Sequence, residues 1–212
     1  MHPLVCRDIE LAATANRLPV GYLSRLLWTE SRFSSAATSP AGAEGVAQFM
    51  PETAVEEGLR NPRDPASSIE DAARLLVRLH RRFGNLGLAA AAYNAGPARL
   101  SQWLQGLSFL PAETVRYVQL VTGYSVERWV AVRTTPAPAA TAQSCAAAIA
   151  EYRRDADSVR PTAWRLPLSI SSDGELVDRE TRQPLAAADR LALHAAIMRA
   201  VGLPPVAMAA DR

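Results

Sequence analysis

Short amphipathic segments, each closed by glycine or proline, fill the first 133 residues of the chain. In the clearest of them, residues 67–83, apolar residues recur every three or four positions, Ser67 and Glu70 have the spacing of a capping box, and Gly84-Asn85 follows. This pattern is typical of a helix with one apolar face that begins at a side-chain cap and ends at glycine. Further helices are expected over residues 4–15, 19–32 and 86–95, and after Pro97 and Pro111. No convincing run of alternating residues interrupts them, so the sequence predicts an all-helical domain over residues 3–133.

The composition changes after this helical region. Residues 134–143 are rich in proline, alanine and threonine, which is typical of a linker. Beyond it we expect a helix around residues 144–154, then strands near Leu166–Ile170 and Leu176-Val177 with a turn at Asp173-Gly174, and a last helix carrying Leu191, Ala195, Met198 and Val201. The sequence therefore predicts a mainly α protein with a small C-terminal α/β appendage of unknown fold and function over residues 144–212.

Several functional classes are excluded or disfavoured by composition. With 49% hydrophobic and 21% charged residues the chain is not a disordered protein. No run reaches the roughly 18–20 consecutive apolar residues of a membrane helix, and residues 1–8 lack the features of a signal peptide. The formal net charge is only +2, and Arg78, Arg81 and Arg82 beside Phe83 are better explained by a solvated helix face than by a nucleic-acid site.

The histidines and cysteines do not have the spacing of a metal site. Three scattered histidines and two cysteines predict no bound metal, and no motif indicates a cofactor. If the protein is exported, Cys6 and Cys145 enter a compartment where thiols pair readily, and a disulfide between them is expected. Cys6 is equally compatible with a small buried apolar side chain.

Glu30 is the first candidate for chemistry. It follows Leu23 and Leu27 at helical spacing, so it continues the apolar stripe of its helix. A carboxyl group held against apolar side chains has its charged form disfavoured, which raises its pKa toward the range that a general acid needs. Taken alone, a solvated glutamate near a helix end is the commoner outcome.

The segment after Glu30 is a glycine-punctuated loop, residues 39–45, followed by Gln48, Met50 and Pro51. Gln48 lies among small and apolar residues and is suited to hydrogen-bonding a sugar hydroxyl or acetamido group. Met50 has an alternative role as core filler, and Pro51 as the first residue of a helix.

Four short sequence blocks follow one another in a fixed order along the chain. They are Glu30-Ser31; Gly45-x-x-Gln48-x-Met50-Pro51-x-Thr53-Ala54; Ala92-Tyr93-Asn94-Ala95-Gly96; and Glu113-Thr114-x-x-Tyr117-Val118. Together they resemble the soluble lytic transglycosylase domain, a lysozyme-like helical fold related to goose-type lysozyme. The resemblance covers roughly residues 6–130 and does not extend to residues 134–212.

The resemblance implies a role for each matching residue. Glu30 would be the sole catalytic acid and base, and Ser39 would lie near the reacting sugar. The other implied substrate-binding residues are Gln48, Met50, Tyr93, Asn94, Glu113 and Tyr117. Tyr93 is expected to hydrogen-bond Glu30 or the substrate, and Glu113 to contact the glycan or its peptide stem.

The implied reaction cleaves the MurNAc-β-1,4-GlcNAc bond of peptidoglycan glycan strands without water and leaves 1,6-anhydro-MurNAc ends. Because peptidoglycan lies outside the cytoplasmic membrane, a periplasmic or otherwise exported protein is expected, with its signal peptide absent from this chain. A partner in the cell envelope or in a secretion machine is compatible with this interpretation, and the sequence does not identify one.

Two alternatives stay open at this point. A lysozyme-like or chitinase-like hydrolase would need a positioned water and Glu113 or Glu52 as a second carboxylate. A non-enzymatic glycan-binding or assembly module would keep the fold alone, but such a module has no need of Glu30.

Overall fold

The computed structural model describes residues 3–131, 144–158, 168–170 and 176–178. Over residues 3–131 it is helical, as predicted, and contains only two isolated β-bridges, Thr38 with Glu44 and Glu44 with Phe49. The helices of this part are α1 (Pro3–Ala15), α2 (Val20–Ser31), α3 (Pro51–Glu57), α4 (Pro65–Phe83), α5 (Leu86–Ala95), α6 (Pro97–Leu104), α7 (Ala112–Thr122) and α8 (Val126–Ala131).

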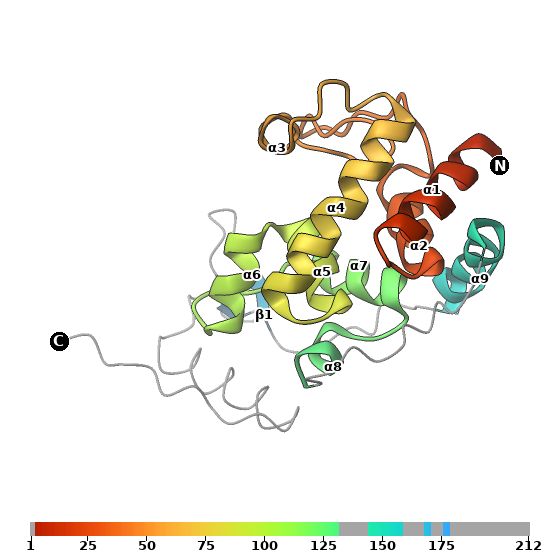
Figure 1. The fold of residues 1–212 in the computed structure, drawn as a ribbon. Helices are drawn as coiled ribbons and strands as arrows, with labels where there is room; N and C mark the ends of the chain where they lie inside the picture. Colours follow the sequence, from red (N-terminus) through yellow and green to blue (C-terminus); the bar gives the residue numbers. More distant parts are fainter. Residues whose placement is uncertain (1–2, 132–143, 159–167, 171–175, 179–212) are drawn as a thin grey trace.

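Helix α5 lies at the centre of the helical region (Figure 1) and contacts α4, α6, α7 and α8. Its residues from Leu86 to Ala92 are all buried, because four successive alanines present little bulk and let neighbouring helices approach closely. Gly87 marks the closest approach: a Cβ there would lie 2.0 Å from the indole of Trp129 on α8. A helix buried on every side needs this composition rather than a single apolar stripe.

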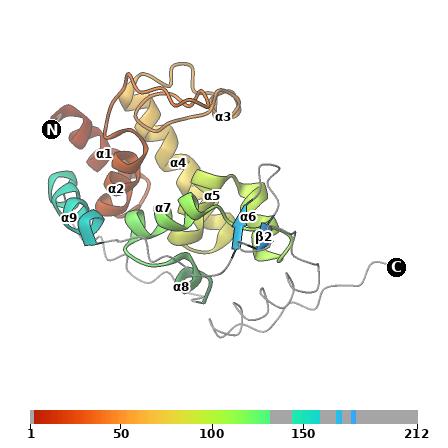
Figure 2. The same cartoon turned by 180° about the vertical axis from the view of Figure 1, so that it is seen from behind.

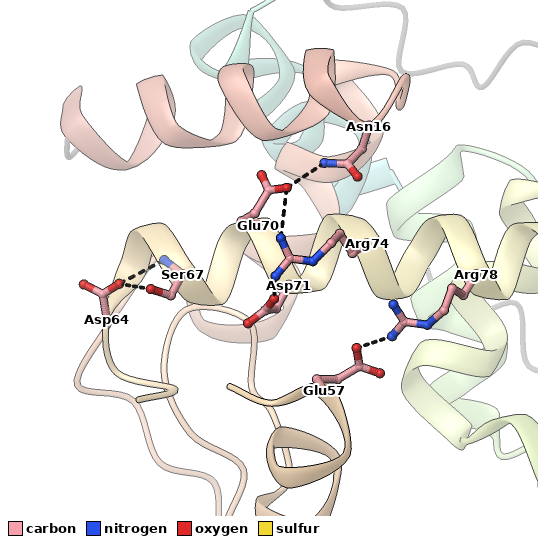
Figure 3. Close-up of polar contacts among 8 residues, drawn as sticks. All are labelled: Asn16, Glu57, Asp64, Ser67, Glu70, Asp71, Arg74 and Arg78. Carbon is pink, nitrogen blue, oxygen red and sulfur yellow. Dashed lines mark hydrogen bonds and ion pairs between the residues drawn. The ribbon is translucent and has the colours of Figure 1, made fainter. Parts of the chain in front are cut away.

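The start of α4 differs from the sequence prediction. The expected capping box of Ser67 and Glu70 is wrong, because the helix begins earlier, at Pro65, with Asp64 as its N-cap. The Asp64 carboxylate accepts hydrogen bonds from the backbone N–H (2.9 Å) and the hydroxyl (2.5 Å) of Ser67 (Figure 3). Glu70 is thereby free to accept a hydrogen bond from Asn16 Nδ2 at the end of α1 (3.2 Å). Gly84 ends the helix in the left-handed conformation, as predicted.

Charged residues along α4 tie this helix to its surroundings (Figure 3). Arg74 pairs with Glu70 (3.3 Å) and with Asp71, and Arg78 pairs with Glu57 at the end of α3. Pairs of this exposure contribute at most about 1 kcal/mol each. The two Arg74 pairs lie within α4 itself, whereas the Arg78–Glu57 pair holds the end of α3 against α4.

The predicted helix and strand pair after the linker are confirmed where the structure describes them. Helix α9 (Cys145–Ser158) lies beside α1 and α2 in both views (Figures 1 and 2) and also contacts α7. Strands β1 (Leu168–Ile170) and β2 (Leu176–Asp178) pair antiparallel, with Ser169 opposite Val177. The predicted linker, the Asp173-Gly174 turn and the last predicted helix lie outside the described residues.

Cys6 and Cys145 form a disulfide, with their Cα atoms 5.4 Å apart. The bond joins the first turn of α1 to the first residue of α9 across 139 positions of sequence. The expected pairing is thus present in the structure, and it holds the N-terminal end of α9 against the helical region.

Candidate active site

Glu30 lies in the last turn of α2, three residues after a stretch of that helix that is buried from Gly21 to Leu27. The side chain is half-buried, and its Oε1 accepts a hydrogen bond from the hydroxyl of Tyr117 on α7 at 2.5 Å. Glu30 therefore continues the apolar stripe of α2, as expected from its spacing. The solvated carboxyl, which that spacing alone favoured, is not what the structure shows.

The surroundings of Glu30 raise its pKa to about 7. The largest cause is burial, which disfavours the charged carboxylate. The Tyr117 hydrogen bond opposes this by stabilising the carboxylate, whereas the negative charge of Glu113 adds to the increase. A carboxyl with this pKa can both donate and accept a proton near neutrality, which is what a single group acting as acid and then as base requires.

The two tyrosines of the matching blocks have different partners. Tyr117 contacts Glu30, whereas the Tyr93 hydroxyl donates to the backbone carbonyl of Ala47 at 2.8 Å. Burial, and then the charge of Glu30, raise the pKa of both phenols well above the usual value, so both stay protonated donors. The hydrogen bond that was expected for Tyr93 at Glu30 is thus made by Tyr117.

The loop between α2 and α3 is fixed by its own polar groups. The Gln48 amide donates from Nε2 to the carbonyl of Gly45 (2.9 Å), and the Ser39 hydroxyl accepts from the backbone N–H of Ala43 (3.0 Å). Ser31, next to Glu30, donates from its hydroxyl to the carbonyl of Val46 (2.8 Å). The loop is thereby fastened to the end of α2 that carries Glu30.

Gln48 and Met50 follow this turn. Gln48 has a left-handed backbone with φ of 52°, which is uncommon for a residue other than glycine, and its side chain is half-buried. Met50 is 37% exposed, so it is not the core filler of the alternative interpretation. It precedes Pro51, which is the first residue of α3, as predicted.

Asn94 and Glu113 come from the end of α5 and the first turn of α7. Thr114 donates from its hydroxyl to Asn94 Oδ1 at 2.7 Å and so joins these two helix ends. Thr114 belongs to the fourth sequence block, but sequence reasoning assigned it no role, although its position three residues before Tyr117 places both on one face of α7. Glu113 is exposed and acts on Glu30 through its charge.

Direct contacts connect the predicted residues in separate pairs. The structure joins Glu30 to Tyr117, Asn94 to Thr114, and Tyr93 to the loop that carries Gln48. The hydrogen bond given for Ser39 stays within its own loop. Among the described residues, no three histidine, cysteine, aspartate or glutamate side chains are grouped so as to hold a metal ion. No described helix is long and apolar enough to cross a membrane.

The chain is similar to known proteins. Over 131 residues the chain is 31% identical to the soluble lytic murein transglycosylase of Escherichia coli strain K12, covering 56% of this chain and 20% of that protein. Over 97 residues it is 41% identical to the peptidoglycan transglycosylase gp16 of Escherichia phage T7, covering 42% of this chain and 7% of that protein. The chain thus spans about a fifth or less of the length of these two relatives.

A solved structure and a family match extend the comparison. The lytic transglycosylase Slt of Pseudomonas aeruginosa, solved as an inactive mutant with glutamine in place of a glutamate, superposes with a TM-score of 0.52 at 30% identity. The match covers 64% of this chain and 26% of that protein. The model of the transglycosylase SLT domain family matches residues 8–113, which is half of the chain. The chain belongs to the transglycosylase SLT domain family.

Proposed function

We propose that this chain cleaves the MurNAc-β-1,4-GlcNAc bond of peptidoglycan glycan strands and closes a 1,6-anhydro ring on MurNAc. The observation that carries the proposal is the half-buried Glu30, hydrogen-bonded to Tyr117 and with its pKa raised to about 7. The family supports a peptidoglycan lytic transglycosylase, and the names of the relatives agree.

In the proposed first step, Glu30 gives its proton to the glycosidic oxygen as the bond from that oxygen to C1 of MurNAc breaks. The acetamido oxygen of the same sugar bonds to C1 and takes the place of the leaving group. Tyr117 donates a hydrogen bond to the carboxylate that this step produces. GlcNAc leaves as an alcohol, and because the acetamido oxygen acts as the nucleophile at C1, no second protein carboxylate is needed.

In the second step, the Glu30 carboxylate takes the proton of the C6 hydroxyl. The C6 oxygen bonds to C1 and displaces the acetamido oxygen, which closes the anhydro ring and returns Glu30 to its protonated form. Both steps are intramolecular in the bound sugar, so positioning supplies much of the rate. Water is neither consumed nor released.

The proposed sugar contacts come from the residues around Glu30. Gln48 uses Nε2 within its loop, which leaves its Oε1 as the atom that we propose accepts from the sugar. We propose that Ser39, Met50, Tyr93 and Asn94 line the glycan path with it. Glu113 is exposed at the start of α7, and we propose that it contacts the glycan or its peptide stem.

An exported location follows from the proposed substrate. The Cys6–Cys145 disulfide supports it, because such bonds persist in oxidising compartments and are rare in the cytosol. We propose a periplasmic or otherwise exported protein, acting alone or with a partner in the cell envelope or in a secretion machine.

The test is the Glu30→Gln variant assayed on purified peptidoglycan, with products measured by mass spectrometry. Glutamine keeps the shape of the side chain and removes the titratable proton, so kcat is expected to fall by at least about 10²–10⁴-fold. Glycan binding, measured by pull-down on insoluble peptidoglycan, should persist. The matched control is Glu56→Gln, an exposed carboxyl on α3 to which neither enzyme mechanism gives a role, and it should leave kcat unchanged.

The product mass separates the alternatives. Muropeptides lighter by one water than the hydrolysed products support ring closure, whereas products that contain the added water would identify a lysozyme-like hydrolase. If the protein without substitutions binds peptidoglycan but does not cleave it, the chain is a glycan-binding module. The inactive glutamate-to-glutamine mutant of the Pseudomonas aeruginosa Slt supports a reaction that depends on one carboxyl.

A further inference from the structure

Helix α9 packs against the two helices that meet at Glu30, although it lies beyond the residues that the family model matches. It contacts α2, which carries Glu30, and α7, which carries Tyr117. Its residues Cys145, Ala148 and Ile149 are buried, so this is a packed interface rather than a surface contact. The side chains on α9 can therefore affect how α2 and α7 sit against each other.

A buried arginine lies at the centre of this contact. Arg25 of α2 is only 1% exposed, and its Nε donates to the backbone carbonyl of Leu120 on α7 at 2.9 Å. One of its terminal nitrogens pairs with Oδ2 of Asp155 on α9 at 2.5 Å, and its guanidinium lies 5.7 Å from the ring centre of Tyr152. A guanidinium stays charged in proteins, and a buried charge needs a partner of opposite sign. Asp155 supplies that charge.

The contacts of Arg25 and of Glu30 join the same two helices, α2 and α7. Arg25 precedes Glu30 by five residues on α2, and Leu120 follows Tyr117 by three on α7. The same two helices are therefore joined twice, by Arg25 with Leu120 and by Glu30 with Tyr117.

Helix α9 is itself held at more than one point. The Cys6–Cys145 disulfide ties its first residue to α1. Arg153 lies 5.2 Å from the ring centre of Trp28 on α2, and Trp28 packs edge-on against Phe33, where the loop after Glu30 begins. The helix is thus positioned to present Asp155 to Arg25.

We propose that Asp155 is a positioning residue for Glu30. By keeping the buried Arg25 against the Leu120 carbonyl, it fixes α2 on α7 and so sets the hydrogen bond between Tyr117 and Glu30. Helix α9 then contributes to catalysis, although it lies outside the region that the family model matches. The inference rests on the proposed function.

The test uses the full chain with Asp155→Asn, and with Glu151→Gln as the matched control on the same helix. Asparagine keeps the size of the side chain and removes the charge. Arg25 is therefore expected to turn toward water and lose its hydrogen bond to the Leu120 carbonyl. We expect kcat on soluble glycan strands to fall about 10- to 100-fold, the cost of a small misplacement of a catalytic group, while KM stays within about twofold. Asp155→Glu should restore most of kcat, and Glu151→Gln should match the unchanged protein.

A second variant keeps the test valid if Asp155→Asn folds poorly. Replacing the pair together, as Arg25→Met with Asp155→Leu, leaves no uncompensated buried charge, and such replacements usually preserve the fold. It still removes the link to Leu120, so kcat should fall here too in a protein with a cooperative thermal transition. Unchanged kcat in this variant would overturn the proposal, as would an equal loss in Glu151→Gln.

Hydrogen exchange separates a failure of this inference from a failure of the proposed function. Measured by mass spectrometry, exchange should become faster in Asp155→Asn over α2 and α7 and stay unchanged over α4, because the hydrogen bond and the ion pair of Arg25 lead to α7 and α9. Unchanged exchange over α2 and α7 would overturn the positioning role. An unchanged protein that releases no anhydro product from peptidoglycan would instead overturn the proposed function, with the exchange result still readable.

Discussion

At the scale of single residues, Glu30 is held between opposing influences. Burial and the charge of Glu113 disfavour its carboxylate, whereas the Tyr117 hydroxyl stabilises it. Because the first is the largest, the pKa settles at about 7 rather than near that of a solvated glutamate. Each neighbour can be removed separately without removing the carboxyl itself.

Two substitutions should therefore move the alkaline limb of the pH profile in opposite directions. The first proposed step needs protonated Glu30, so kcat/KM falls as the pH rises through the pKa of the free enzyme. Tyr117→Phe removes a hydrogen bond to the carboxylate, which raises this pKa and shifts the limb to higher pH. Glu113→Gln removes a repelling negative charge, which lowers the pKa and shifts the limb to lower pH.

The measurement is kcat/KM on soluble glycan strands from about pH 5 to pH 9, a range that includes the alkaline limb of the unsubstituted protein and of each variant. Glu56→Gln again serves as the control, since Glu56 is not among the groups that shift the pKa of Glu30. Limbs that move in the same direction, or that do not move, would contradict this account of the site.

At the scale of elements, the loop between α2 and α3 depends on one close approach. Gly45 has φ of 75°, and a Cβ on it would lie 1.8 Å from the backbone oxygen of Pro62. The loop that carries Gln48 is therefore seated against the segment before α4, and only glycine permits this distance. Gly42 in the same loop has φ of 90° but meets no atom within 4 Å.

Alanine at these two glycines should separate backbone strain from steric exclusion. Gly42→Ala carries only the cost of a left-handed backbone and should lower the free energy of unfolding by about 1–2 kcal/mol. Gly45→Ala adds a clash with main-chain atoms and should cost about 3–5 kcal/mol, the range of the most disruptive single changes. Chemical denaturation of both variants gives the values, and equal losses would show that the contact with Pro62 is not constraining.

The elements also show what sequence can and cannot predict. Gly84 and Gly96-Pro97 determine the backbone locally, so the helix ends there were predictable. The start of α4 was not, because Asp64-Pro65 and Ser67 with Glu70 both have the pattern of a helix start. The end of α1 lies beside this turn, and Asn16 takes Glu70 as its partner.

The candidate active site likewise has features that local sequence predicts and features that depend on tertiary contacts. Local periodicity placed Glu30 on the apolar stripe of α2, but that feature alone favoured a solvated carboxyl, and the four blocks together were needed to single Glu30 out. Which tyrosine reaches Glu30 depends on how α5 and α7 cross α2, and no periodicity contains that information. Arg25 is less predictable still, because Asp155 lies 130 positions further along the chain.

At the scale of the whole molecule, a helix late in the sequence packs against the first two helices of the chain. Helix α9 follows the predicted linker, and the Cys6–Cys145 disulfide and the Arg25–Asp155 pair place it on α1 and α2. The division of the chain into residues 3–133, 134–143 and 144–212 stays a prediction. The unit that we propose to be active includes α9, and so extends across the predicted linker.

The disulfide provides the last prediction. A sequence-specific protease site is inserted at residues 136–141 and cleaved. The two pieces should stay joined on a non-reducing gel and remain active on peptidoglycan, because Cys6–Cys145 keeps α9 on α1.

In the uncut chain, Cys6→Ser with Cys145→Ser opens a loop of 139 positions, which should lower the free energy of unfolding by about 4–5 kcal/mol in the chain-entropy description. Denaturant titration measures that loss. Two alkylatable thiols in protein purified from an oxidising compartment, or pieces that separate without reductant, would contradict the covalent tie.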